Sequence, residues 1–219
     1  MPVIPCDLME QEFREHKLGM LIDGVSFEQE ANLWSNTPLQ IAQDLHIQEA
    51  WIEWESCKIG DYGFIVAIHP EGETNLKASA SQGATSVNVG AAYAPYYNPA
   101  NGKRSIEFWN AAETELLEVR TVTGISSPNV NFTPGLAAAR DTTVKVKPVY
   151  GRYGPIRGSN GNLGGYRMIA SGVAHIENPF SISARLPSGF IIGVRVKTVS
   201  TSGTRQFAIN FLFRSPEDE

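Results

Sequence analysis

Alternation of apolar and polar side chains is the feature that most limits the fold of this chain. The clearest case lies near the C-terminus, where large apolar residues occupy every second position from Phe207 to Phe213. That spacing puts four large side chains on one face of a β-strand. Shorter alternating runs predict further half-buried strands at 117–122, 142–147 and 194–198.

A continuously apolar run, 64–68, stops at His69-Pro70 and predicts a strand buried in the centre of a sheet or sandwich. Glycine-containing turn signals separate the predicted strands. The strongest is Asn101-Gly102, which should join strands at 94–97 and 105–109 in a hairpin because both residues tolerate a positive φ. We therefore predict an all-β fold, an antiparallel jelly-roll-like β-sandwich with little helix.

Two stretches of unusual composition predict the domain organisation. Residues 79–93 are small and nearly uncharged, and residues 151–165 contain six glycines, which indicates a flexible connector. Neither outer segment has enough strands to cover two sheet faces by itself. We therefore predict an N-terminal arm (1–19), a discontinuous sandwich domain (20–78 with 150–219) and a smaller inserted β domain (79–149).

Composition excludes several classes of protein. Only 19% of the 219 residues are charged, which argues against a charge-driven disordered chain or a coiled coil. The net charge of −5 argues against a partner made of nucleic acid. There is no apolar run of membrane-spanning length and no early apolar segment typical of a signal peptide. Cys6 and Cys57 predict free thiols, and no Cys/His spacing predicts a metal; we expect no cofactor.

Candidates for catalysis are weak. His69 could pair with Asp61 to orient a base for Ser56 or Ser79, but no nucleophile-turn motif is present. Glu53 and Glu55 would share one face of a strand, whereas a glycosidase needs two carboxylates that face each other across a cleft. The prediction is therefore that the chain is not an enzyme.

Candidates for partner contact are better supported. Arginines flank the glycine-rich stretch, and a loop of this kind could order against an acidic partner subunit. Tyrosines and a tryptophan flank the predicted hairpin, where they could cover a protein interface, stack on a sugar or pack in the core of the inserted domain. The predicted contact residues are Arg152, Arg157, Arg167, Tyr96, Tyr97 and Trp109.

Three segments carry a resemblance to a known group of proteins. They are Leu186–Phe211, with its glycine-led Arg195 strand, its Ser202-Gly203 turn and its final strand carrying Asn210; Ile59–Pro70; and the combination of Glu118–Gly124, Gly135–Ala139 and Val144. Together they resemble accessory structural proteins of tailed-bacteriophage virions. Gly63 departs from the family's pattern, which has a hydrophobic residue after the Gly60-Asp61-Tyr62 motif.

This resemblance implies a non-enzymatic virion part assembled in the cytoplasm of a bacterial host. The expected role is a tail, baseplate or neck accessory or adaptor, bound to other virion proteins and oligomeric as a trimer or hexamer. The terminal arms, 1–17 and 214–219, would reach neighbouring subunits. Alternatives are a capsid decoration protein, a carbohydrate-binding module of a host-receptor binder that uses Trp109, and a hydrolase that uses Glu53 or Glu55.

Overall fold

The computed structural model describes residues 62–101 and 104–157 and, outside these ranges, individual strands. The fold is mostly β, and every strand pairing in it is antiparallel. Among the described residues, helix is confined to three single turns of 3₁₀ helix: η1 (Pro70–Gly72), η2 (Ala94–Tyr97) and η3 (Pro99–Asn101). The prediction of an antiparallel β protein with little helix is therefore confirmed.

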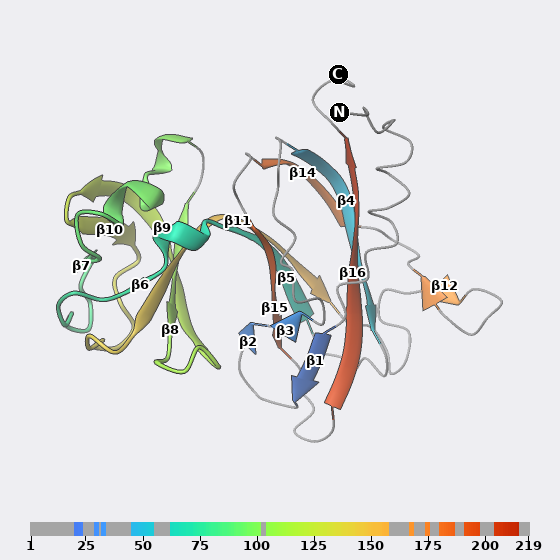
Figure 1. Ribbon diagram of the computed structural model, residues 1–219, viewed down its shortest axis with the longest axis horizontal. Helices are drawn as coiled ribbons and strands as arrows, with labels where there is room; N and C mark the ends of the chain where they lie inside the picture. Colours follow the sequence, from blue (N-terminus) through green and yellow to red (C-terminus); the bar gives the residue numbers. More distant parts are fainter. Residues whose placement is uncertain are drawn as a thin grey trace, which may run out of the picture.

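The strands form two large sheets and one small one (Figure 1). The five-stranded sheet has the order β14 (Phe180–Leu186), β4 (Leu45–Trp54), β16 (Thr204–Arg214), β1 (Met20–Asp23), β3 (Asn32–Leu33). The second has the order β2 (Gln29–Glu30), β15 (Ile191–Lys197), β5 (Tyr62–Ile68), β11 (Lys145–Arg157), β8 (Ser105–Trp109), β9 (Leu116–Ser126), β10 (Asn129–Thr133), β7 (Ser86–Asn88), with β6 (Thr74–Asn75) also paired to β11. The small sheet pairs β12 (Arg167–Met168) with β13 (Ala174–His175).

Three of the alternating runs lie in strands, whereas the strand predicted at 142–147 begins only at Lys145, because residues 142–143 form a turn. The Phe207–Phe213 run lies in β16, and β16 pairs with β4 on one side and β1 on the other. The apolar run at 64–68 lies in β5, which pairs with both β15 and β11 and ends before His69. Val66, Ala67 and Ile68 are buried, whereas Tyr62 and Phe64 are half-buried, so the C-terminal half of this apolar run is the part that enters the core.

The predicted hairpin at Asn101-Gly102 is wrong in its first strand. The segment Ala94–Tyr97 is the 3₁₀ helix η2, and Pro95 occupies its first turn. Proline has no N–H for a sheet ladder, and its fixed φ suits the start of a helical turn. Gly102 itself lies outside the described residues.

The predicted connector at 151–165 also needs correction. Residues up to Arg157 belong to β11, whose far half pairs with β5 from Val149↔Ile68 to Arg157↔Tyr62. The near half of β11, Lys145–Val149, pairs with β8. β11 thus pairs with two groups of strands. The glycine content of 151–165 did not predict that the strand continues to Arg157. Residues 158–165 lie outside the described residues.

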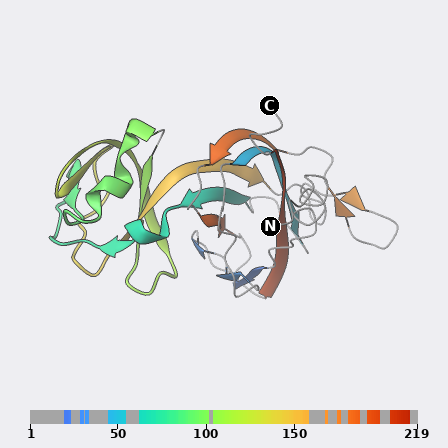
Figure 2. The same cartoon turned by 45° about the horizontal axis from the view of Figure 1, so that its top comes forward.

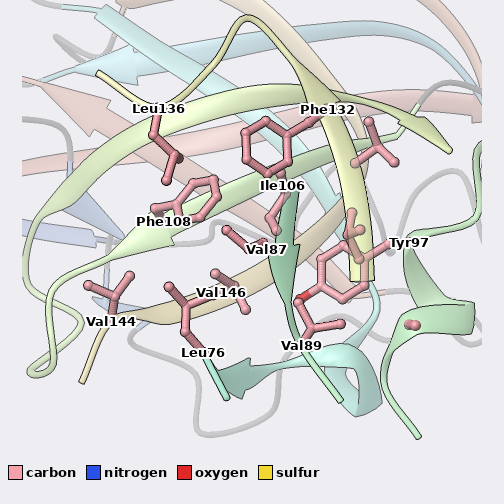
Figure 3. Close-up of a cluster of buried hydrophobic side chains, with 13 residues drawn as sticks. Leu76, Val87, Val89, Tyr97, Ile106, Phe108, Phe132, Leu136, Val144 and Val146 are labelled. Carbon is pink, nitrogen blue, oxygen red and sulfur yellow. The ribbon is translucent and has the colours of Figure 1, made fainter. Parts of the chain in front are cut away.

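One compact hydrophobic cluster organises the residues at the other end of β11 (Figure 3). Its members come from β7, β8, β9, β10, η2 and β11 and from the adjoining loops. Those buried completely include Val89, Tyr97, Ile106, Phe108, Val130 and Val146. We call residues 70–149, which surround this cluster, the small unit. In Figure 1 its strands β6 to β10 lie at the left, β5 and β15 lie in the middle, and β16 lies further to the right.

The division into domains stays a prediction, although packing bears on its edges. Leu76 packs in the cluster of the small unit, and β11 runs through residue 150 without a break. Close packing also marks the passage from β5 into the small unit. A Cβ atom on Gly72 would lie 2.3 Å from Cγ of Pro148 and 2.8 Å from Cβ of Tyr96, so only glycine fits there.

Candidate functional site

Two of the predicted contact aromatics are part of the interior. Tyr97 and Trp109 both have 0% exposed surface, so the structure corrects their assignment to a partner surface and supports the alternative of core packing. The Tyr97 hydroxyl donates a hydrogen bond of 3.0 Å to the backbone oxygen of Gly72, and burial raises the pKa of this phenol well above its usual value, with a smaller effect from Glu73. Tyr96 is half-buried, and its role in contact stays a prediction.

The three predicted arginines lie on two strands. Arg152 is in the far half of β11 and has most of its side chain covered; Arg157 ends the same strand, and Arg167 begins β12. Arg152 stacks on the ring of Phe64, with 3.7 Å between the guanidinium carbon and the ring centroid. The side chains of Arg157 and Arg167 lie outside what the structure describes, so their contact role stays a prediction.

A buried carboxylate, Glu107, organises the most unusual group of side chains in the described residues. It lies on β8 with 0% exposure, and its Oε2 atom accepts hydrogen bonds from Nε of Arg195 at 2.8 Å and from Nε1 of Trp109 at 3.1 Å. Its Oε1 atom accepts a hydrogen bond from Arg152 at 3.2 Å. We call these four residues the Glu107 cluster. A buried charge is tolerated when it is paired and hydrogen-bonded, as Glu107 is here.

The sequence explains why Glu107 and Trp109 face away from the hydrophobic cluster. Residues of β8 alternate, so Ile106 and Phe108 enter the cluster of the small unit while Glu107 and Trp109 occupy the opposite face. On that face they meet Arg195 from β15, whose guanidinium carbon lies 4.8 Å from the Trp109 ring centroid. This cation–π contact and the ion pair hold the same guanidinium.

Gly193 lets two side chains of β5 pack closely against the backbone of β15. A Cβ atom on Gly193 would lie 2.6 Å from Cδ1 of Ile68 and 3.2 Å from Cγ2 of Val66. The sequence pattern Gly193–Val196 therefore combines close strand packing with a buried cation. Arg195 itself has 0% exposure.

A second set of charges adjoins the cluster. The ammonium of Lys147 lies 5.4 Å from the Trp109 ring centroid and 2.8 Å from a carboxylate oxygen of Glu113, which also pairs with Lys145. Glu113 adopts the left-handed region at φ 57°. Burial alone would raise the pKa of Glu113, but hydrogen bonds from Lys145 and Lys147 outweigh burial and lower it. All three side chains thus hold their charges in pairs.

A third carboxylate fixes a loop inside the small unit. Glu118 accepts hydrogen bonds from Nε of Arg140 at 2.6 Å and from the backbone N–H of Ala137 at 3.0 Å, and it also pairs with Arg120. Arg120 in turn donates to the backbone oxygen of Gly135 at 3.1 Å. Glu107 and Glu118 are therefore two buried carboxylates whose partners lie in different places. Glu107 binds arginines of β15 and of the far half of β11, whereas the partners of Glu118 all belong to the small unit.

The histidine considered for catalysis has an aromatic neighbour. The His69 ring lies 4.5 Å from the ring of Tyr96, whose hydroxyl donates to Glu71 at 2.9 Å. Burial lowers the pKa of His69, Glu71 acts in the opposite direction, and Arg104 lowers it further. Asp61 and Ser56, its predicted companions, lie outside the described residues.

We expect His69 to make stability depend on pH. Because its pKa is lower in the folded state, the unfolded chain takes up the proton first, so the stabilisation is complete above the unfolded pKa near 6.5. It is lost as pH falls from there through the folded pKa, at a slope below about 1.4 kcal/mol per pH unit, the limit for one proton. Urea unfolding between pH 8 and 5 should show a shallower decline for His69→Gln than for the wild type. Identical slopes for wild type and His69→Gln would contradict this expectation.

The other candidate residues are not brought together by the described structure. Glu53 lies on β4 opposite Ala208 of β16, and Glu55 is outside the described residues. His175 pairs with Arg167 across the two-stranded sheet. Within the described ranges, no group of three His, Cys, Asp or Glu side chains could hold a metal ion, and no helix is long and apolar enough to cross a membrane.

Sequence reasoning missed the Glu107 cluster. Its signal was a single acidic residue inside the otherwise apolar run Ile106–Trp109, and a single arginine inside Val194–Val196. From the alternation of 194–198 we predicted a half-buried strand, with Arg195 on its polar, exposed face. Only the sheet order, which places β15 and β8 on either side of β5 and β11, brings the two charges together.

Comparison with known proteins adds no family. No protein-family model matches the chain, and no match was found among curated proteins or solved structures.

Proposed function

We propose that this chain is a non-enzymatic structural subunit of a tailed-bacteriophage virion, acting as an adaptor or accessory in the tail, baseplate or neck. The observation that carries the proposal is the use of β11 by two groups of strands, which joins the small unit to β5 through one continuous strand. An adaptor needs two presented surfaces on one rigid body. The proposal also draws on the sequence resemblance to virion accessory proteins.

The proposal includes the finer architecture. The five-stranded sheet and the β15–β5 part of the second sheet lie near each other in both views of the molecule (Figures 1 and 2) and would form the two layers of a jelly-roll-like sandwich. The small unit would be the inserted domain. Strongly polar residues of the described core, such as Glu107 and Arg195, are engaged in ion pairs, and this supports a scaffolding role for them.

The test is the assembly of the purified chain and its location in particles. Light scattering coupled to size-exclusion chromatography should give a mass of three or six protomers, and an antibody against the chain should label particles of the phage that encodes it at the tail or neck. Label on the shell would favour the capsid decoration alternative. A monomer at every concentration, with no label on particles, would overturn the proposal.

A paired variant tests the predicted contacts. The double substitution Arg157→Ala and Arg167→Ala should reduce the oligomer fraction if these arginines meet an acidic neighbour. Lys77→Ala, which removes an exposed cation of the small unit, is the matched control and should leave assembly unchanged. Equal thermal unfolding of both variants would show that the loss belongs to contact and not to folding.

A further inference from the structure

Two stretches of backbone connect the small unit to β5 and to the far half of β11. The first leaves β5 at Ile68 and enters η1. The second is β11 itself, whose register against β5 changes between Val149↔Ile68 and Gly151↔Ala67. Tyr150 is the extra residue at this irregularity. A β-bulge bends the strand that carries it, so β11 has a natural bending point where it leaves the small unit.

Among the described side chains, one small apolar cluster spans this junction. Val66 and Ile68 of β5 pack with Val149 in a cluster separate from that of the small unit, and Phe64 lies against them. Hydrophobic packing of this kind is non-directional, so it holds surfaces together without defining their angle. Something more directional is needed to fix the small unit in one orientation about the bulge.

The Glu107 cluster supplies that direction. Glu107 belongs to the small unit, whereas Arg195 is on β15 and Arg152 lies beyond the bulge on β11. The two arginines approach different oxygen atoms of the same carboxylate, at 2.8 Å and 3.2 Å. Charge-assisted hydrogen bonds are strongly directional, and two of them from separate strands define the position of the carboxylate.

Each arginine is in turn held by an aromatic ring on one side of the junction. Arg152 stacks on Phe64 of β5 at 3.7 Å, and Arg195 stacks on Trp109 of the small unit at 4.8 Å. A third stacking contact, between Arg104 and Tyr150 at 3.8 Å, holds the bulge residue itself. These contacts restrict the rotamers of the arginines. If the small unit moved, the arginines could not keep their hydrogen bonds to Glu107 by changing rotamer.

We infer that Glu107 locks the orientation of the small unit about the β11 bulge. Buried ion pairs contribute little net stability compared with apolar residues of the same volume, but they can select one arrangement among several. The inference concerns the mechanics of this chain and does not depend on the proposed virion role. It assigns Glu107 as a positioning residue whose loss frees a hinge at Tyr150-Gly151.

The test compares two buried carboxylates. Glu107→Gln and Glu118→Gln remove the same charge, one at the junction and one inside the small unit. Hydrogen exchange read by mass spectrometry should show about ten- to hundredfold faster exchange at 62–69, 147–153 and 191–197 for Glu107→Gln, with Ile106, Val122 and Val130 still protected. Glu118→Gln should instead accelerate exchange at 134–140 and leave 147–153 unchanged.

Small-angle scattering on the same samples should show a broader distribution of distances for Glu107→Gln only. If Glu107→Gln does not fold, Arg152→Met gives the answer, because it removes one bond and keeps the buried Arg195–Glu107 pair. For Arg152→Met the faster exchange should again be confined to the junction. Wild-type exchange at 147–153, or equal acceleration throughout the small unit, would overturn the inference.

Discussion

Glu107→Ala is expected to reduce the free energy of unfolding by about 3–5 kcal/mol, the range seen when one partner of a buried ion pair is removed. The substitution leaves the guanidinium of Arg195 buried without its carboxylate, and it also removes the acceptor of the Trp109 indole N–H. Urea unfolding followed by circular dichroism measures the change. The loss should appear as a lower midpoint with an unchanged denaturant dependence.

A double-mutant cycle separates the cost of the orphaned charge from the value of the pair. Arg195→Met alone should also be destabilising, because it leaves Glu107 with a reduced set of donors. The combination of Glu107→Leu with Arg195→Met removes both charges and should recover much of the loss, since apolar replacements of a buried pair are often neutral or stabilising. Strict additivity of the single substitutions would contradict the pairing of these two side chains.

Much of the fold could be predicted because alternation is a local property. The strands at 64–68, 117–122, 194–198 and 207–213 follow from which face each residue must bury. The failures were at proline and glycine. The segment that contains Pro95 was predicted to be a strand and is the 3₁₀ helix η2. The glycines after residue 150 predicted a connector, although β11 continues to Arg157. Both errors come from reading these residues as turn signals without knowing the neighbouring strand.

The candidate site was harder to predict, because its members come from distant parts of the chain. Glu107 and Arg195 are separated by 88 positions and meet only through the sheet order. Surface contact was predicted for Trp109 from its place beside a supposed hairpin. The alternation of β8 in fact turns Trp109 toward a face that Arg195 and Lys147 cover. Side-chain direction was predictable there, but the covering partner was not.

Trp109→Ala is expected to lower the free energy of unfolding by about 3–5 kcal/mol, as for other large aromatic residues truncated in a core. The side chain has 0% exposure, and its removal opens a cavity between Glu107, Arg195 and Lys147. Polar groups around an empty space lose their packing partner as well as the indole N–H donor. Equilibrium unfolding in urea is again the measurement, with hydrogen exchange at 105–109 as a local readout.

Trp109→Phe is the matched control, because it keeps an aromatic face for the two cations, whereas it removes the indole N–H that donates to Glu107 and part of the ring volume. It should cost about 1–3 kcal/mol, the usual penalty for a buried acceptor that loses its partner. The same pair of variants decides between the core role of Trp109 and a sugar-binding role. A sugar-stacking tryptophan at the surface would give Trp109→Ala near wild-type stability together with loss of glycan binding. A buried tryptophan gives the opposite pattern: both variants lose stability, and Trp109→Ala loses more than Trp109→Phe. The reason is that the ring packs against charged groups that are shielded from solvent.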